Sequence, residues 1–584
     1  MNAVPEASPA LIAAREAEAL VAQCLQDHHS FLLEAGAGAG KTYSLVEALK
    51  SLIEHEGPQL RRDHQRIACI TYTNAATSVI NSRIDSDPLV FVDTIHAFCW
   101  SLIRKFQPAL RLLVAAMPEW EEKLAEVDGI GSRTVEYELG YRRVTADTVT
   151  LHHDDVLGLM VSLLPNAKFQ ALLGQQYPFV LIDEYQDTDI AVMTSMSEHL
   201  LGRAAGPMIG LFGDHWQRIY DKTCGHVAHE SLTEIGKKAN FRSAAKIVDV
   251  LNRMRPNLPQ ALKDEGVVGS AIAFHTNAWQ GERRSGAGGG HWKADLPAEM
   301  AHAYLATLIK KLESDGWDLA PQRTKILMLT HNVLASEQGY DSITKIFSYT
   351  DQFIKKEDPL IAFFCDVLEP ACAAFQHKRF GEMFSLLGGS APAVTSYADK
   401  VAWSSSMEGL VKIRLDGTIG KVLDYILEHV QPRLPEAVLG TLRQAAEWHG
   451  EEGEEPPRRV QQLRLLRDVF YKEVIALDSF IDGHTPFATK HSVKGDEFEN
   501  VLIVIGRGWN KYNFDQFLQW SAEGVPEGKR EAYERNRNLF YVCCSRPTTR
   551  LALLFTQELS DTSLALLHNW FGGAIGPAPA PPEG

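Results

Sequence analysis

The chain of 584 residues carries 58 Lys and Arg against 74 Asp and Glu, which gives a net charge of −16. Its length predicts about four structural units, and its 45% hydrophobic and 23% charged residues exclude collagen-like, coiled-coil and wholly disordered chains. The net negative charge argues against a protein that coats DNA by bulk charge, although it does not exclude a local basic groove.

The cysteines and the N-terminal residues bear on the cellular compartment. None of the eight cysteines forms a CxxC pair, so we expect reduced, mostly buried thiols rather than zinc or iron–sulfur sites. Residues 1–20 lack the continuous apolar stretch of a signal peptide, and no apolar run approaches the roughly 18 residues of a membrane span. We therefore expect a cytoplasmic protein with no membrane partner.

Short apolar runs recur along the chain, each followed by a polar and often helical stretch. Buried parallel strands that alternate with helices have this pattern, which favours an α/β fold of the doubly wound kind. The runs fall before about residue 240 and after about residue 270, so two α/β cores are predicted. The expected strands are Phe31–Leu33, Ile67–Thr71, Phe179–Ile182, Met208–Phe212, Ile326–Leu329, Val501–Ile505 and Leu551–Phe555.

Two long segments, residues 101–170 and 346–477, lack clear strand runs and are predicted to be largely helical. Three others are rich in Gly, Pro or charge, at residues 281–290, 450–457 and 572–584. We interpret these three as solvated loops and a flexible tail.

The strongest local pattern is AGAGAGKT at residues 35–42, which follows a predicted strand and precedes an amphipathic helical pattern. Glycines in this context let backbone N–H groups close around phosphate oxygens at a helix N-terminus. Lys41 would neutralise the β- and γ-phosphates, and the Thr42 hydroxyl would ligate Mg²⁺. An incidental Gly/Ala turn is the alternative. The predicted nucleotide-binding residues are Gly36, Ala37, Gly38, Ala39, Gly40, Lys41 and Thr42.

An acidic segment, residues 183–187, directly follows the predicted strand that ends at Ile182. Carboxylates at the end of a buried strand are costly unless they meet a cation or a reacting water. Asp183 is suited to hold Mg²⁺, and Glu184 to take a proton from the attacking water. Helix capping is the weaker alternative.

Eight segments, in order from residue 35 to residue 546, resemble the motifs of superfamily 1 DNA helicases of the UvrD/Rep/PcrA type. They are AGAGAGKT at 35–42, TYTNAA at 71–76, TIHAF at 94–98, DEYQD at 183–187, GDHWQRIY at 213–220, NFRS at 240–243, TKHSVKGDEF at 489–498 and LFYVCCSR at 539–546. The resemblance implies two RecA-like parallel-sheet motor cores, each with a mainly helical insertion.

The resemblance also implies roles for residues that no local pattern would single out. Gln217 would sense the γ-phosphate, while Arg242 and Arg546 would be arginine fingers that stabilise transition-state charge. Phe241 would stack on adenine, and Glu497 would bind the ribose.

Single-stranded DNA is expected across the tops of both cores, again by resemblance. Tyr72 would stack a base, which is worth ~1–3 kcal/mol and tolerates any sequence. The other predicted DNA contacts are Thr73, Asn74, Thr94, His96, Lys222, Thr489 and His491.

Two of the chain's departures from the family pattern bear on its predicted binding sites. Lys222 stands where the family carries a stacking Trp, which predicts weaker stacking and DNA binding that depends more on salt. The family's adenine-reading glutamine is not at its usual distance before Lys41, since Gln23 stands closer, so adenine specificity is less secure than phosphate binding.

The expected domain organisation follows from the motif order. It is a first motor core at 1–97 and 173–236 with an insertion at 98–172, a second core at 237–345 and 478–571 with an insertion at 346–477, and a flexible tail at 572–584.

The sequence and its resemblance together predict an ATP- and Mg²⁺-dependent DNA helicase or translocase that acts on single-stranded DNA and duplex/single-strand junctions. Movement in the 3′ to 5′ direction by closure of two motor cores is what the resemblance implies. The alternative is a DNA-sensing ATPase subunit of a nuclease-containing repair or phage-defence complex with little unwinding of its own. A nucleotide-dependent switch that does not bind nucleic acid is a third, weaker reading.

Overall fold

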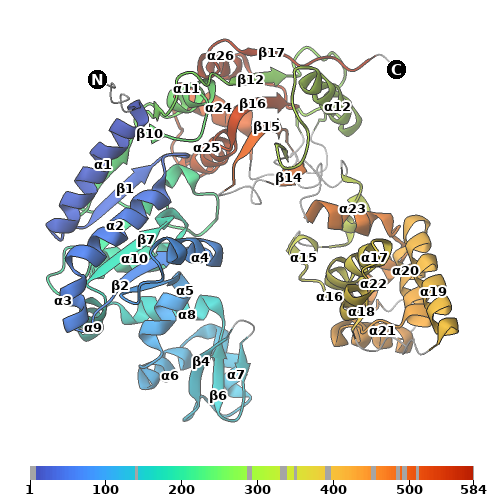
Figure 1. Cartoon of the computed structure of the whole chain (residues 1–584), viewed down its shortest axis with the longest axis horizontal. Coiled ribbons are helices and arrows are strands. Elements are labelled where there is room, and N and C mark those ends of the chain that lie inside the picture. Colours follow the sequence, from blue (N-terminus) through green and yellow to red (C-terminus); the bar gives the residue numbers. More distant parts are fainter. Residues whose placement is uncertain are drawn as a thin grey trace. The chain divides into compact units, whose positions relative to one another are not determined.

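The computed structural model describes residues 8–138, 142–285, 293–328, 338–347, 351–388, 396–448, 455–481, 487–489, 496–507 and 512–582. Contact density divides the chain into two units (Figure 1). The first comprises Met1–Ala273, Tyr512–Leu551 and Ser560–Ile575, and the second comprises Phe274–Lys511, Ala552–Leu559 and Gly576–Gly584. The first unit therefore holds segments that the sequence assigns to both predicted cores.

The first unit is built on a six-stranded parallel sheet in the order β3-β2-β7-β8-β1-β9. Its strands are β1 (Phe31–Ala35), β2 (Ile67–Thr71), β3 (Val90–Thr94), β7 (Phe179–Asp183), β8 (Met208–Gly213) and β9 (Thr233–Lys237). Helices α1 (Pro9–Gln26), α2 (Lys41–His55), α3 (Gly57–Arg62), α4 (Asn74–Arg83) and α10 (Ile190–His199) belong to the same unit.

Both faces of this sheet are buried, which explains the continuous apolar runs in its sequence. Successive residues of a strand point to opposite faces. Phe31 and Leu33 accordingly pack in one hydrophobic cluster with α1 and α2, whereas Leu32 packs in another with α5, α8 and α10. The α/β class with parallel sheets that the sequence predicts is confirmed.

The first insertion is mainly helical, with α5 (Ile95–Ile103), α6 (Gln107–Ala115), α7 (Pro118–Ala125), α8 (His153–Leu163) and α9 (Ala167–Gln176). It also contains a three-stranded sheet, β4 (Thr134–Tyr137), β5 (Arg143–Val144) and β6 (Thr148–Leu151). The segment is largely helical, as predicted. Its three strands were not predicted, because they have four residues or fewer and their Thr- and Arg-containing sequences form no apolar run.

The first unit is completed by short strands β10 (Ala239–Asn240) and β11 (Ala261–Leu262), which pair in parallel, and by four helices. These helices are α11 (Ala245–Met254), α24 (Phe514–Glu523), α25 (Arg530–Cys544) and α26 (Asp561–Trp570). They bring residues that the sequence assigns to the second core into the unit that carries the phosphate loop.

A second six-stranded sheet has the order β14-β13-β15-β16-β12-β17. Its strands are β12 (Ser270–His275), β13 (Thr324–Met328), β14 (Phe487–Thr489), β15 (Phe498–Ile505), β16 (Pro547–Phe555) and β17 (Ile575–Pro577), with β13 parallel to both β14 and β15. Along the chain, β12 and β16 each cross the division between the two units.

Most of the second unit's helices form the second insertion, as the sequence predicts. Helix α12 (Ala298–Ser314) precedes β13. The remaining described α-helices of this unit are α14 (Asp341–Ile346), α15 (Asp351–Ile354), α16 (Pro359–Phe363), α17 (Glu369–Gln376), α18 (Phe380–Leu387), α19 (Tyr397–Asp416), α20 (Ile419–Tyr425), α21 (Glu436–Glu447), α22 (Arg458–Asp468) and α23 (Lys472–Ile481). Two π-helical segments, Phe364–Leu368 and Ile426–Val430, follow α16 and α20 directly.

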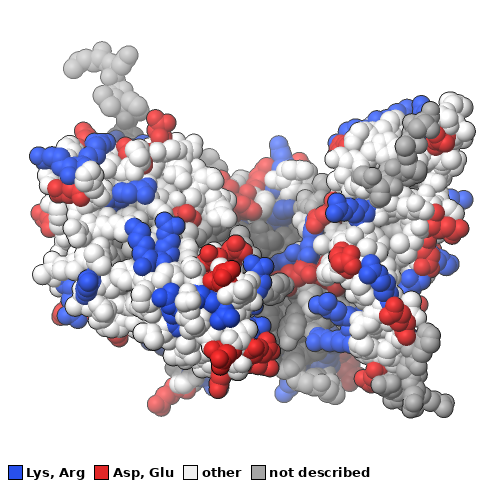
Figure 2. Space-filling view, turned by 90° about the horizontal axis from the view of Figure 1, so that it is seen from below, with Lys and Arg blue, Asp and Glu red and all other residues white. Residues whose placement is uncertain are grey.

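In the described part of the chain, no single helix has the length and apolar content to cross a membrane, and only α8 with α9, bent by 109°, meet that criterion as a pair. On the face seen in Figure 2, basic and acidic side chains are intermixed. Among the described residues, this face therefore has no single continuous acidic surface, despite the net negative charge of the chain.

Candidate nucleotide site and nucleic-acid surface

The phosphate-loop sequence forms a tight turn between β1 and α2. Gly38 and Gly40 have φ of 76° and 77°, a left-handed conformation that glycine adopts without strain. Gly40 caps α2, which begins at Lys41, so the free backbone N–H groups of this helix face the turn. The turn therefore has the form of an anion-binding loop.

Lys41 and the acidic pair that follows β7 lie together beside this turn. Lys41 Nζ donates to Glu184 Oε2 at 3.0 Å. Burial alone would lower the pKa of Lys41, but the neighbouring carboxylates, Glu184 first among them, raise it. Lys41 is thus a buried cation held by acidic groups at the end of the parallel sheet.

Asp183 is buried and ends β7, and its pKa is raised to about 7 by burial and by the charge of Glu184. A buried carboxylate beside a second carboxylate is stabilised in its charged form by a bound cation. Together with the hydroxyl of Thr42 in the first turn of α2, it forms a donor set of hard oxygens that fits Mg²⁺.

Glu184 occupies a strained backbone position. It has φ 46° and ψ 46°, in the left-handed region that side-chain-bearing residues seldom adopt, between β7 and the 3₁₀ turn Tyr185–Asp187. Glu184 Oε2 also accepts from Gln186 Nε2 at 2.6 Å. The strain and the hydrogen bonds fix the carboxylate at the edge of the sheet, as is common in active sites.

A chain of hydrogen bonds runs from the acidic pair to Gln217. Gln186 Oε1 accepts from the backbone N–H of Asp214 at 3.0 Å, and Gln217 Nε2 donates to Asp214 Oδ2 at 2.7 Å. Arg546 Nη2 lies 3.5 Å from Gln217 Oε1. The predicted base, γ-phosphate sensor and arginine finger thus belong to one network.

The two predicted arginine fingers lie in the same region. Arg546 is 2% exposed, and its pKa is lowered to about 10 by burial and by the charge of Arg242. The β-carbon of Arg242 lies 2.9 Å from the position that a β-carbon on Gly38 would occupy, so any side chain there would collide with it. Two like charges beside a phosphate loop form a site suited to a polyanion.

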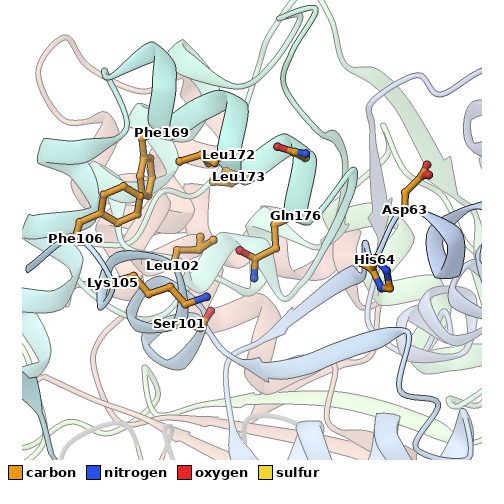
Figure 3. A pocket seen from close by; sticks show the side chains of 11 residues that line it. Asp63, His64, Ser101, Leu102, Lys105, Phe106, Phe169, Leu172, Leu173 and Gln176 are labelled. Carbon is orange, nitrogen blue, oxygen red and sulfur yellow. The ribbon is translucent and has the colours of Figure 1, made fainter.

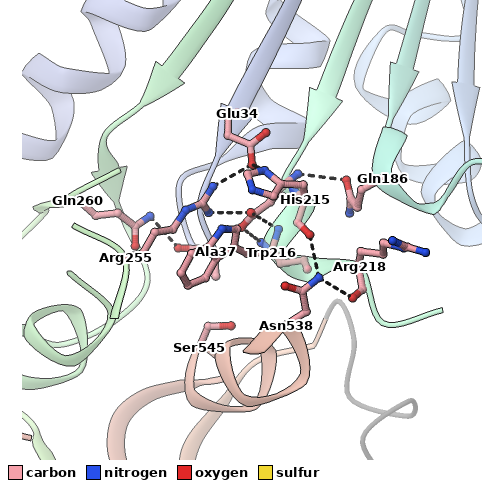
Figure 4. Close-up of polar contacts among 12 residues, drawn as sticks. Glu34, Ala37, Gln186, His215, Trp216, Arg218, Arg255, Gln260, Asn538 and Ser545 are labelled. Atoms are coloured by element: carbon pink, nitrogen blue, oxygen red, sulfur yellow. Dashed lines mark hydrogen bonds and ion pairs between the residues drawn. The ribbon is translucent and has the colours of Figure 1, made fainter. Parts of the chain in front are cut away.

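Two residues to which the sequence analysis assigns no role, Asn240 of the NFRS motif and Gln260, lie against the loop. Gln260 Nε2 donates to the carbonyl of Ala37 at 3.0 Å (Figure 4). Asn240 Nδ2 donates to the same carbonyl at 3.2 Å. Gln260 also donates to the carbonyl of Ala239 at 2.9 Å. Because the partners of Gln260 are 21 and 223 positions away in sequence, no local pattern could reveal this contact.

The residues predicted to hold the nucleoside differ in their surroundings. Phe241 packs against Ala10 and Ala14 of α1, and its backbone N–H donates to the carbonyl of Gly38 at 2.9 Å. Glu497 is exposed before β15 and belongs to the second unit. The roles of both in binding adenosine stay predictions.

The predicted DNA contacts of the first core gather where β2 and β3 end. These strands pair in parallel with Thr71 opposite Thr94. The hydroxyls of Thr73 and Thr94 accept from backbone N–H groups of α4 and α5, at 3.2 and 3.4 Å. Two helices therefore begin beside each other at the carboxyl ends of the parallel strands, where the phosphate loop also lies.

Exposed side chains surround these helix starts. Tyr72 is 43% exposed and its ring stacks on Tyr220, with centroids 5.5 Å apart and an interplanar angle of 27°. Asn74 and Lys222 are also exposed, and Lys222 has φ 62°. The stacked pair, with Tyr72 exposed and Tyr220 partly buried, offers a ring face suited to a base, and Lys222 follows Tyr220 by two residues in the chain.

His96 is partly buried, and its role in binding DNA stays a prediction. Its ring meets that of His153 edge-on at 5.1 Å, and burial followed by the charge of His153 lowers its pKa. Thr489 ends β14, and His491 lies outside the described residues.

A separate hollow of about 310 Å³ lies between α5 and α9 (Figure 3). Its wall includes Lys105, Phe106, Phe169 and Gln176. None of its lining residues belongs to the predicted nucleotide or DNA sets.

The turn after β1, the acidic pair after β7 and the paired arginines define a P-loop ATP hydrolase of the helicase class. A family model described as an AAA domain matches residues 17–223, which include the phosphate loop and the acidic pair. In its motifs, in this match and in the relatives that follow, the chain is similar to superfamily 1 helicases of the UvrD/Rep/PcrA type.

Three curated proteins illustrate this relationship. The Gabija protein GajB of Bacillus cereus strain HuB5-5 is 23% identical, over 91% of this chain and 93% of its own length. GajB of Bacillus cereus strain VD045 is 28% identical over 43% of this chain and 52% of its own length. The ATP-dependent DNA helicase PcrA of Leuconostoc citreum is 24% identical over 42% of this chain and 40% of its own length.

Proposed function

We propose that the protein uses ATP and Mg²⁺ to move along single-stranded DNA and to separate duplexes ahead of it, in the 3′ to 5′ direction. The observation that supports this most is that the phosphate loop and the predicted DNA contacts both lie at the carboxyl ends of the strands of one parallel sheet. The phosphate loop follows β1 at these ends, and the starts of α4 and α5 follow β2 and β3. A change at the nucleotide therefore has a short path to the nucleic-acid surface.

The nucleotide chemistry follows from the side chains around the loop. Lys41 and the loop N–H groups would bind the phosphates, and Glu184 would accept the proton of the attacking water. Mg²⁺, held by Thr42 and Asp183, would neutralise charge on the phosphates. Gln217 would orient the γ-phosphate end of the site.

The two arginines would supply the remaining positive charge. Arg242 and Arg546 are planar, always-charged groups suited to stabilising charge that develops on the transferred phosphoryl group. Both lie in segments that the sequence assigns to the second core. Their engagement with the phosphate would couple hydrolysis to closure of the two motor cores.

The strand would be held mainly by its backbone. Helix N-termini at Asn74 and Ile95 offer N–H groups to phosphates, and Tyr72 with Tyr220 offers a surface on which bases stack. Such contacts read no sequence. DNA binding is therefore expected to be sequence-tolerant and sensitive to salt.

The test is an ATPase titration with single-stranded DNA, duplex DNA and RNA, run beside strand displacement on substrates with 3′ or 5′ tails. Stimulation by single-stranded DNA and displacement from 3′ tails are expected. A rate that does not respond to any nucleic acid would contradict the proposal, and preference for 5′ tails would reverse the direction. The Lys41→Ala protein controls for contaminating ATPase.

A second function deserves the same test. The match that spans nearly the whole chain is with a protein named GajB, whereas the match with a protein named as a DNA helicase covers 42% of the chain. This favours keeping open a DNA-sensing ATPase subunit of a nuclease-containing repair or phage-defence complex. Displacement only when a copurifying nuclease is present would support that alternative over an autonomous helicase.

A further inference from the structure

Arg255, directly after α11, is a buried arginine outside all eight helicase-like motifs. Its side chain is 2% exposed. Nη1 donates to Asp214 Oδ1 at 2.7 Å, and Nη2 donates to Glu34 Oε1 at 2.9 Å (Figure 4). Since Glu34 stands in β1 and Asp214 follows β8, one guanidinium joins the ends of two paired strands.

Glu34 is fully engaged by this arrangement. Its Oε1 also accepts from the backbone N–H of His215 at 3.0 Å and contacts His215 Nδ1 at 2.8 Å, and its Oε2 accepts from the Tyr185 hydroxyl at 2.9 Å. Burial alone would raise the pKa of Glu34, but His215 and then Arg255 lower it below its ordinary value. Glu34 is therefore a carboxylate that stays charged in the interior.

Asp214 is engaged in the same way. Its Oδ1 accepts from the backbone N–H of Trp216 at 3.0 Å as well as from Arg255, and its Oδ2 accepts from Gln217 Nε2 at 2.7 Å. Glu34, Asp214 and His215 have the mutual spacing of a metal site. Because all four carboxylate oxygens of the two acids are hydrogen-bonded, the guanidinium supplies the positive charge that a metal ion would otherwise bring.

Aromatic rings fix the orientation of the guanidinium. It lies over Trp216, 5.0 Å from the ring centroid, and 5.8 Å from that of Tyr541 in α25. The guanidinium of Arg537 also lies over Trp216, at 4.2 Å. Asn538 holds the same turn through the carbonyl of His215 at 3.0 Å. The turn that carries Gln217 is thus held by Arg255, directly after α11, and by residues of α25.

We propose that Arg255 is a positioning residue for ATP hydrolysis. Its guanidinium holds Asp214 against Glu34, and Asp214 in turn fixes the amide of Gln217. The inference rests on the proposed ATPase function and extends the site by a residue that acts without contact to the nucleotide. A lysine is not equivalent, because an ammonium cannot present two N–H groups in a fixed plane to two carboxylates.

The test is a double-mutant cycle with Arg255→Met, Gln217→Ala and the combined protein, read as kcat and KM for ATP without DNA. Each single change is expected to lower kcat about tenfold or more, with KM for ATP within about threefold of the native value. If Arg255 acts through Gln217, the combined protein is expected to have a kcat within about threefold of the worse single variant. Effects that multiply would overturn the proposal, as would a native kcat in Arg255→Met.

Two further variants serve as controls for the effect of Arg255→Met. Arg255→Lys keeps the charge and is expected to recover part of the lost kcat. If circular dichroism shows that Arg255→Met does not fold, Arg255→Lys replaces it in the double-mutant cycle. Lys246→Met removes an exposed charge from the same helix and should have native kinetics. The cycle is measured on ATP hydrolysis in the absence of DNA. If DNA did not stimulate the ATPase of the native protein, the proposed function would be contradicted, but the effect of Arg255 on basal hydrolysis could still be interpreted.

Discussion

Two regions on one edge of the first sheet differ in how their polar groups are used. Around the phosphate loop, Lys41 bonds to Glu184, which is 143 positions away, and Asp214 bonds to Arg255, which is 41 positions away. Near the start of α4, Tyr72 is exposed, and Lys222, two residues after the stacking partner Tyr220, is exposed as well. The first region is pre-organised for one ligand geometry, which phosphoryl transfer requires. The second is an open surface, which suits a strand of any sequence.

The largest effect is expected from the pre-organised region. Glu184→Gln keeps the shape and one hydrogen bond but removes the base, so kcat for ATP should fall about 10³-fold. DNA affinity should be native in this protein and in Lys41→Ala. Phosphate release measured with saturating single-stranded DNA checks the first expectation, and anisotropy of a labelled oligonucleotide checks the second.

Glu47→Gln, an exposed change of the same kind on α2, is the matched control and should have native turnover. Normal DNA-stimulated phosphate release from Glu184→Gln or Lys41→Ala would show that the nucleotide site has been assigned wrongly.

Arg546 allows the same region to be tested from the other predicted core. Arg546→Lys retains a charge but not the planar donor set, so kcat should fall about 10²-fold with little change in nucleotide affinity. Steady-state ATPase and binding of a fluorescent ATP analogue measure the two quantities. Arg530→Lys, at an exposed arginine of α25, the helix that ends two residues before Arg546, should behave as the native protein. A loss confined to nucleotide affinity would argue that Arg546 binds the ground state only.

On the open surface the effects should be smaller and fall on DNA binding. Tyr72→Ala removes one stacking ring, and at ~1–3 kcal/mol per base the dissociation constant for single-stranded DNA should rise about tenfold. The kcat at saturating DNA should change little. Fluorescence anisotropy across an oligonucleotide titration gives the constant, with Tyr397→Ala, an 81% exposed tyrosine on α19, as the control. An unchanged constant would remove Tyr72 from the strand path.

The smallest effect concerns Lys222. Lys222→Trp should make the salt dependence of DNA binding shallower by about one unit of slope and add stacking. Because Lys222 has φ 62°, a tryptophan there is strained, and Lys222→Asn provides a charge-free comparison that tolerates this backbone. The difference between the two variants isolates the ring. The idea fails if Lys222→Trp leaves both affinity and slope unaltered.

Local patterns predicted those features that depend on neighbouring residues. The phosphate loop and the acidic pair are each formed by consecutive residues, so a local pattern reveals them. The seven predicted apolar runs correspond to β1, β2, β7, β8, β13, β15 and β16. Strand β3 was not expected, because four of its five residues are only partly buried and its run is weak.

Features made by long-range contacts could not be predicted. Arg255 bonds to a residue 221 positions earlier, and Asn538 to one 323 positions earlier. Nothing in the local sequence of either distinguishes it from a surface residue of an amphipathic helix. The surroundings of the nucleotide site become evident only once the chain has folded.

The left-handed backbone of Glu184 has a mechanical consequence. An L-residue in this conformation is disfavoured by roughly 1–2 kcal/mol, so its neighbours hold it there against its own preference. The buried strand β7 on one side and the turn Tyr185–Asp187 on the other act as the clamp. Any loosening of that turn would let the carboxylate relax away from the loop long before the sheet itself unfolds. The stiffness of three residues is thus a condition for turnover.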